Sequence, residues 1–333
     1  MTSVQYDVLG IGNAIVDVIA QTEEDFLVKH GMQKGAMALI DEARAAQIYQ
    51  AMGPTIESSG GSAANTIVGV ASFGARAAFV GKVKKDTLGD VFAHDIRAAG
   101  VAFDTRSAAG GPSTARCYVL ITPDGERTMN TYLGAAQNLH PRDIDPDMIA
   151  RAAITYLEGY LWDPKDAKEA FIKAAKAAHA AGRQVALTLS DAFCVDRYRD
   201  EFLDLIRKGT VDIVFANEGE LKSLYQTADF HAAIGQLRND ARFAVVTRSE
   251  HGCVVVTAAS VTPVPAFPID KLVDTTGAGD LFAAGFLVGL AHGSDHTTCG
   301  KYAALAAAEV IQHVGARPQQ SLKALAAANG LRA

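Results

Sequence analysis

The most informative stretch of the chain reads Asp274-Thr275-Thr276-Gly277-Ala278-Gly279-Asp280-Leu281-Phe282, and an apolar run from 283 to 290 follows it. Two glycines around an alanine leave the backbone almost bare, and the residues behind them favour a helix. Amide N–H groups of such a turn can point at one spot in front of a helix N-terminus, and that spot attracts anions. The acid after the glycines suits a base that takes the proton of an attacking hydroxyl in phosphoryl transfer. The structural alternative is a tight turn followed by a helix acid that the macrodipole favours.

Length and composition set the class of protein. The chain has 333 residues, of which 49% are hydrophobic and 20% charged, which suits one large globular α/β unit with an embellishment. The net charge of -6 provides no basic surface, so neither nucleic acid nor a membrane is an expected partner. No signal-peptide pattern and no run of ~18 apolar residues is present, which predicts a cytoplasmic protein. The cysteines are widely separated and form no CxxC, which argues against a disulfide framework or a zinc site.

The order of the expected elements predicts the architecture. A buried strand covers 6–12, and its Gly10-Ile11-Gly12 lacks the third glycine of a dinucleotide-binding turn. Pro123-Asp124-Gly125 separates two β-rich runs and predicts a hairpin. From residue 154 onward strands and helices alternate, which predicts a parallel sheet with helices on both faces. The expected strands there are 154–158, 185–189, 211–216, 243–247 and 253–257, and the expected helices are 165–181, 198–208, 218–225 and 230–239.

Polar residues gather where the expected strands end. Ligands of such sheets bind at the carboxyl ends of the strands. Those ends carry Ser190-Asp191, Asn217-Glu218-Gly219-Glu220 and Thr247-Arg248-Ser249. We therefore expect the chemistry to cluster at this edge of the sheet.

Three motifs occur in the order of one known family. Gly60-Gly61-Ser62-Ala63-Ala64-Asn65, Asn217-x-x-Glu220 and the stretch 274–282 resemble the signatures of the ribokinase-like (PfkB) carbohydrate and nucleoside kinases. The resemblance implies a doubly wound, mostly parallel α/β sheet with helices on both faces and a small β-sheet lid. The large kinase domain would comprise 1–13, 43–102 and 134–333, and the lid over the acceptor site would comprise 14–42 and 103–133.

Within this family the chain most resembles the adenosine kinases. The similar segments are Gly12-Asn13-x-x-x-Asp17, 127–136, 189–193 and 314–316. They imply ATP-dependent phosphorylation of the 5′-hydroxyl of adenosine to AMP, a reaction of purine salvage. The alternative is a related kinase for a free sugar or another nucleoside. A nucleoside-binding protein without activity would have no use for the base Asp280 at an anion site.

The resemblance also implies roles for single residues. Asp280 would be the base, the amides of 277–279 would hold the transferring phosphoryl group, and Arg127 would reach phosphate from the lid. Residues that would bind the acceptor fall into a group for the ribose and a group for the base. The ribose group is Asn13, Asp17, Gly60, Gly61, Ser62 and Asn65, and the base group is Ile15, Met37, Leu133 and Phe193.

The implied nucleotide site departs from the family pattern at one position. Its residues would be Ser190, Asn217, Thr247, Ser249, Gly252 and Gly279, and Ser249 stands where the family's TxGxxG loop has glycine. Asn217 and Glu220 would hold Mg²⁺ through water, because Mg²⁺ loses its hydration shell reluctantly; a helix cap is the structural alternative. The family pattern also implies a monovalent cation such as K⁺, for which Asp274 and Gly315 are candidate ligands. The expected partner is a small nucleoside, and the expected assembly is a monomer or a dimer.

Overall fold

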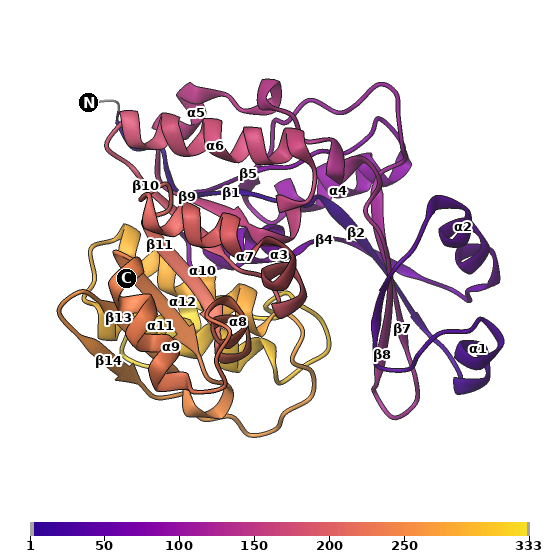
Figure 1. The fold of residues 1–333 in the computed structure, drawn as a ribbon. Coiled ribbons are helices and arrows are strands. Elements are labelled where there is room, and N and C mark those ends of the chain that lie inside the picture. Colours follow the sequence, from indigo (N-terminus) through magenta and orange to yellow (C-terminus); the bar gives the residue numbers. More distant parts are fainter. Residues whose placement is uncertain (1–2, 332–333) are drawn as a thin grey trace.

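The computed structural model describes residues 3–331, and its strands form two separate sheets (Figure 1). The larger sheet has nine strands in the order β14-β13-β12-β11-β10-β9-β1-β5-β6. Neighbours are parallel from β12 to β6, and the β12–β13 and β13–β14 pairs are antiparallel. In that order the strands are Val261–Val264, Cys253–Thr257, Phe243–Thr247, Ile213–Asn217, Gln184–Thr188, Ala152–Glu158, Tyr6–Ile11, Ala77–Val80 and Val101–Ala102.

Helices cover both faces of this sheet, as the alternating pattern predicted. One apolar core lies under α3, α4, α10, α11 and α12, and a second core lies under α5 to α9 on the opposite face. The first group is Ser62–Ser72, Thr87–Ala98, Ala278–Ala291, His296–Val310 and Leu322–Ala328. The second group is Pro146–Ala150, Lys165–Ala180, Ala192–Arg207, Glu218–Leu224 and Phe230–Asp240. Short 3-10 turns η1 to η4 cover Gly134–Asn138, Pro141–Asp143, Gly159–Trp162 and Ser249–His251.

The smaller sheet is the lid, which projects from one side of the large unit (Figure 1). Its strands run in the order β3-β8-β7-β2-β4 and are Met37–Leu39, Arg127–Tyr132, Ala115–Ile121, Ile15–Gln21 and Ile56–Gly60. β7 and β8 form the predicted antiparallel hairpin. Two short helices lie beside its strands. α1 (Glu24–Lys29) falls within the predicted lid segment, whereas nearly all of α2 (Glu42–Ala51) falls in a segment assigned to the large domain. Their buried side chains pack on one face of the lid, and the opposite face turns toward the large unit.

Two predicted boundaries differ from the structure. Residues 43–102 were assigned to the large domain, but β4 pairs with β2 in the lid, with Ser59 opposite Val16. The pairing joins segments that lie far apart in the sequence, so local periodicity does not reveal it. The helix expected at 198–208 begins at Ala192, and Tyr198 inside it has non-helical angles, φ −123° and ψ 24°. That kink explains why the helical pattern is clear only beyond it.

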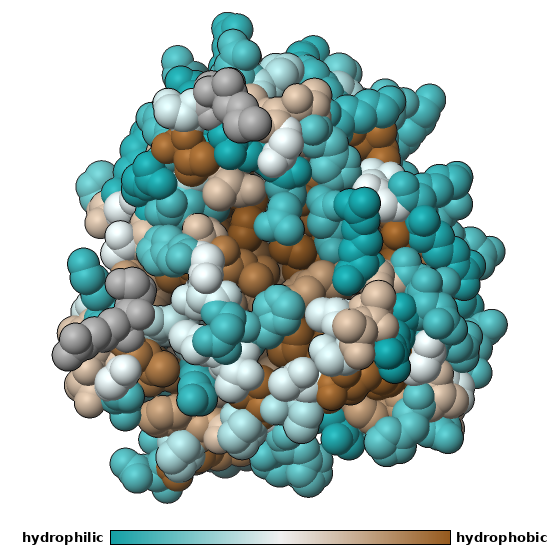
Figure 2. All heavy atoms as spheres, turned by 90° about the vertical axis from the view of Figure 1, so that its left-hand side faces the viewer, coloured by the Kyte–Doolittle hydropathy of each residue, from teal (hydrophilic) through white to brown (hydrophobic). Residues whose placement is uncertain are grey.

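The face that Figure 2 shows lies on the left of Figure 1, away from the lid. Hydrophilic residues cover most of its described part, and hydrophobic residues form small separated groups, as is ordinary for a water-exposed surface. None of the helices within residues 3–331 combines the length and the hydropathy that crossing a membrane requires.

Candidate active site

One cleft between the lid and the carboxyl ends of the large sheet's strands collects the predicted site residues. Its volume is about 1850 Å³, whereas a pocket for one small ligand typically has roughly 300–1,000 Å³. The cleft therefore has room for two small molecules side by side. Of the residues singled out from the sequence, all but Gly60 and Asp274 line it. Gly60 lies behind the residues that line the cleft. A Cβ atom added to Gly60 would come 2.3 Å from Asp17 Oδ2.

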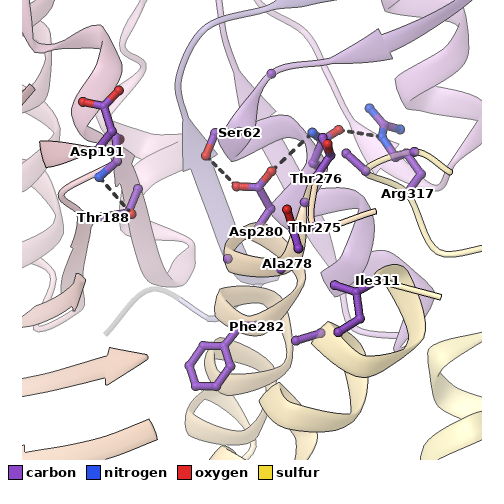
Figure 3. Close-up of a pocket in the computed structure, with 18 of the residues that line it drawn as sticks. Ser62, Thr188, Asp191, Thr275, Thr276, Ala278, Asp280, Phe282, Ile311 and Arg317 are labelled. Carbon is purple, nitrogen blue, oxygen red and sulfur yellow. Dashed lines mark hydrogen bonds between the residues drawn. The ribbon is translucent and has the colours of Figure 1, made fainter. Parts of the chain in front are cut away.

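Asp280 lies in the first turn of α10 and faces Ser62 across the cleft (Figure 3). Ser62 Oγ donates to Asp280 Oδ1 at 2.6 Å, and Asn65 Nδ2 donates to Oδ2 at 3.3 Å. Burial raises the pKa of Asp280 to about 6, although both hydrogen bonds and the charge of Arg317 act to lower it. The carboxylate can thus accept a proton more readily than an ordinary aspartate and remain mostly ionised at neutral pH. Ser62 contacts this carboxylate as the first residue of α3, whose N-cap is Gly61.

The backbone before Asp280 forms the bare turn that the sequence predicted, and one of its three amides differs from the expectation. Gly277 is the N-cap of α10 with φ 79°, and a Cβ there would meet Ala316 Cα at 2.7 Å, so the position needs glycine. Ala278 N donates to Thr275 O at 3.2 Å, and this amide is therefore already engaged. Within the described chain, the amides of Gly277 and Gly279 have no such acceptor. The free donors at the helix N-terminus are thus fewer than the sequence predicted.

Arg127, on lid strand β8, binds Asp274, in the loop before α10. Arg127 Nη1 lies 2.9 Å from Asp274 Oδ2, and each side chain is 10% exposed. Asp274 Oδ2 also accepts from Gly315 N, and Oδ1 accepts from Thr276 N and Oγ1. Both carboxylate oxygens therefore hold donors, and the guanidinium supplies the positive charge that a monovalent cation would bring. This arrangement of Asp274 and Gly315 does not fit a bound K⁺.

The lid presents an apolar wall that contains one acid. Along β2, Ile15, Asp17 and Ile19 line the cleft, while the residues between them are buried on the other face. Burial raises the pKa of Asp17 to about 6, and Arg317 and Arg127 counteract that rise. Among the described residues, none donates a hydrogen bond that influences the pKa of the Asp17 carboxylate. An acid held in this way is available for the hydroxyl groups of a ligand.

Asn13 is oriented by an acid that sequence reasoning missed. Glu158, at the end of β9, accepts from Asn13 Nδ2 at 2.6 Å, from Asn13 N at 3.2 Å and from Ala63 N at 2.8 Å. Asn13 Oδ1 is buried without a partner in the part of the chain described. Burial raises the pKa of Glu158 to about 7. The strand-end rule that selected Ser190 and Asn217 could have found Glu158, because it ends a neighbouring strand.

Phe193 is one of several aromatic side chains that line the cleft from the large unit. It lies in the first turn of α7 and is 64% exposed. The guanidinium of Arg197 lies 4.6 Å from the ring centroid, and Arg197 Nη2 binds Asp163 Oδ2 at 3.0 Å. Met37 and Leu133 line the same cleft from the lid side. An aromatic ring and aliphatic side chains therefore border one space.

The predicted nucleotide residues include two with unusual backbone angles. Ser190 has φ 74° and Ser249 has φ 50°, in the region that favours glycine. Ser249 thus has a backbone conformation that glycine adopts more readily. Gly252 has φ 75°, and a Cβ there would meet Val264 O at 2.1 Å. Strained residues of this kind cluster at functional sites.

Asn217 and Glu220 form a reciprocal helix cap at the start of α8. Asn217 Oδ1 accepts from Glu220 N at 2.8 Å, and the Glu220 carboxylate accepts from Asn217 N and Nδ2 at 3.0 and 2.5 Å. Burial raises the pKa of Glu220 to about 7. Within residues 3–331, no cluster of three or more His, Cys, Asp or Glu side chains could hold a metal directly. The pair fits Mg²⁺ only through water, since each carboxylate oxygen retains a lone pair for a water molecule.

Comparison with known proteins places the chain among the kinases. Residues 47–323 match the profile described as pfkB family carbohydrate kinase. An adenosine kinase from Sinorhizobium meliloti is 54% identical, with a TM-score of 0.91, over 98% of this chain and 99% of that chain. A probable sugar kinase from Rhizobium etli CFN 42 is 52% identical, with a TM-score of 0.92, over the same shares. The adenosine kinase of Saccharomyces cerevisiae is 28% identical over 330 residues, which is 92% of this chain and 94% of that protein.

Proposed function

The chain belongs to the pfkB family of carbohydrate kinases, and from this premise we propose that it transfers the γ-phosphoryl group of ATP to the 5′-hydroxyl of adenosine. A phosphotransferase of this family needs a base, an anion site and an acceptor pocket. Asp280, at the N-terminus of α10, is the proposed base. Its raised pKa allows it to take the hydroxyl proton as the oxygen attacks phosphorus. The two similar solved structures carry the names of an adenosine kinase and a probable sugar kinase, so the acceptor is the point to establish.

The adenosine proposal rests on two hydrogen-bond acceptors that line the cleft and receive no hydrogen bond from the described residues of the protein. Asn13 Oδ1 is buried without a partner, and the Asp17 carboxylate has no donor in the described chain. Two adjacent hydroxyls of a ribose are suitable donors for such groups, because a charged acceptor gains most from them. The aliphatic wall and Phe193 leave room for a flat base beyond the sugar. A free pentose would leave that part of the cleft wet.

The phosphoryl group is proposed to lie at the N-terminus of α10. The amides of Gly277 and Gly279 donate to its oxygens, and preorganised donors of this kind stabilise charge that develops in the transition state. Arg127 has Nε and Nη2 buried without partners, so phosphate oxygens can engage it from the lid. Mg²⁺, when bound with ATP, would neutralise phosphate charge and be held through water by Asn217 and Glu220. Closure of the lid over both ligands excludes water from the reaction.

A substrate panel tests the proposal directly. ADP release is measured at saturating ATP and Mg²⁺ with adenosine, other nucleosides, ribose and fructose. Stacking of a base contributes roughly 1–3 kcal/mol, so kcat/KM for adenosine should exceed that for ribose by about one to two orders of magnitude. Phe193→Ala should raise KM for adenosine and leave any ribose activity unchanged. Tyr49→Ala, at an exposed aromatic outside the cleft, is the matched control. A better rate with ribose or fructose would show that the chain is a sugar kinase.

A further inference from the structure

Arg317 joins three parts of the site from the loop after α11. Its Nε donates to Asn65 Oδ1 at 2.9 Å, and its Nη2 donates to Ser59 O at 2.5 Å and to Ser59 Oγ at 2.9 Å. Asn65 belongs to α3, whereas Ser59 belongs to the lid strand β4. The guanidinium therefore connects the C-terminal loop to the lid and to the helix that faces the base. Figure 3 shows it on the opposite side of Asp280 from Ser62.

The contact with Arg317 decides which way the Asn65 amide points. A guanidinium has only donors, so the group facing it must be the acceptor oxygen Oδ1. The other end of the amide, Nδ2, then faces Asp280 Oδ2. Without Arg317 the amide could turn and present an oxygen to the carboxylate, which would repel it. Arg317 thereby fixes one of the two hydrogen bonds to the base.

The charge of Arg317 faces several acids. It lowers the pKa of Asp280 and of Asp17, and Asp95 accepts from Ser59 Oγ beside it. The other titratable groups that interact with Asp280 are Asp17 on β2, Tyr156 and Glu158 on β9, and Tyr160 in η3. Arg317 is the cation among these neighbours. Its removal should make Asp280 easier to protonate.

We propose that Arg317 is a positioning residue for the base, which orients Asp280 through Asn65 and holds the lid strand β4 in register with the reaction centre. The inference rests on the proposed function, because it assumes that Asp280 is the base. Arg317 itself exchanges no proton with the substrate. A displacement of a catalytic group by ~1 Å can cost 10²-fold in rate, so loss of this orientation has a measurable effect.

Three substitutions test the proposal. Arg317→Gln should lower kcat about 10- to 100-fold, with KM for ATP unchanged, and should move the acid limb of the pH profile to higher pH. Arg317→Lys keeps the charge but cannot hold Asn65 and Ser59 together, because an ammonium lacks the planar fork. It should leave the acid limb close to that of the unmodified protein while kcat stays reduced. Arg76→Gln, which removes an arginine bound to Asp7 and Val4 O far from the cleft, should change stability alone.

The outcomes separate this inference from the proposed function. If Asp280→Asn abolishes turnover but Arg317→Gln keeps the normal kcat and acid limb, Arg317 has no positioning role. If Asp280→Asn also turns over normally, the proposed base is wrong. If a thermal melt shows that Arg317→Gln does not fold, the test rests on Arg317→Lys. A normal kcat in Arg317→Lys would contradict the need for the guanidinium fork.

Discussion

The guanidinium of Arg127, on lid strand β8, binds the carboxylate of Asp274, in the loop before α10, with 2.9 Å between Nη1 and Oδ2. Arg127→Ala should lower the free energy of unfolding by about 1.5–3 kcal/mol, the range for hydrogen bonds to charged groups, because Asp274 keeps its charge in a largely buried place. Chemical denaturation measures the change. Arg242→Ala removes a matched arginine whose side chain is 75% exposed beside Asp212 and should cost less than about 1 kcal/mol. Equal effects of the two substitutions would contradict the role of burial.

The raised pKa of Asp280 predicts the pH dependence of catalysis. As the proposed base, Asp280 must be ionised, so kcat/KM for the acceptor should fall about tenfold per pH unit below pH 6, because the pKa of Asp280 is about 6 in the free protein. Asp17, with a similar pKa, titrates in the same range. Asp280→Asn should lower the activity about 10²- to 10⁴-fold. The pH profile of the remaining activity should lack the acid limb that Asp280 causes. An unchanged acid limb in Asp280→Asn would assign that titration to another group.

The same pKa predicts how stability depends on pH. The folded-state pKa of about 6 exceeds the unfolded value of 3.8, so the folded protein holds the proton more tightly and loses stability as the pH rises through about 6. Asp280→Asn removes the titrating carboxyl group, so the variant does not lose stability through its ionisation. Its Tm should therefore exceed that of the unmodified protein at pH 8, and the difference should shrink between pH 6 and pH 4. A difference that is constant with pH would show that Asp280 is not strained by burial.

Asp17 should distinguish acceptors by their hydroxyl groups. Asp17→Ala should weaken the binding of adenosine by about 1.5–3 kcal/mol, the range for hydrogen bonds to a charged group, and should affect a deoxy analogue far less. Calorimetric titration with both ligands measures the two losses. Ile19→Ala, in which a neutral side chain on the same strand is shortened, should affect both ligands alike. Equal losses in Asp17→Ala would remove Asp17 from the recognition of the diol.

Replacing Ser249 by glycine should make the folded protein more stable. With φ 50°, its Cβ costs roughly 1–2 kcal/mol, and the greater freedom of an unfolded glycine offsets about 0.5–1 kcal/mol of the gain. Ser249→Gly should therefore raise the free energy of unfolding by about 0.5–1 kcal/mol, measured by denaturation. Ser107→Gly, at an exposed serine with ordinary backbone angles, should bring no gain. A destabilised Ser249→Gly would show that the hydroxyl has a contact that matters more than the strain.

Patterns within short segments were predictable from the sequence, and contacts between distant segments were not. The hairpin around Gly125 and the alternation beyond residue 154 follow from turn chemistry and periodicity, and both are present. The motif residues meet in one cleft because strand ends share an edge of the sheet. The pairing of β4 with β2 and the ion pair between Arg127 and Asp274 depend on how remote segments pack. Residues 314–316 were singled out from the sequence, but no local pattern marks Arg317 beside them.

The contacts around Asp280 have a consequence for the newly synthesised chain. Gly315 and Arg317, which bind Asp274 and Asn65, are translated after the last described strand, β14, whereas Asn13 and Asp17 are translated before most of the strands. A nascent chain can form the hairpin and much of the sheet, but the Asn65 amide beside Asp280 lacks its guanidinium partner until translation passes residue 317. Under the proposed role of Arg317, a nascent chain should therefore reach its full rate of phosphate transfer only after this loop has been translated.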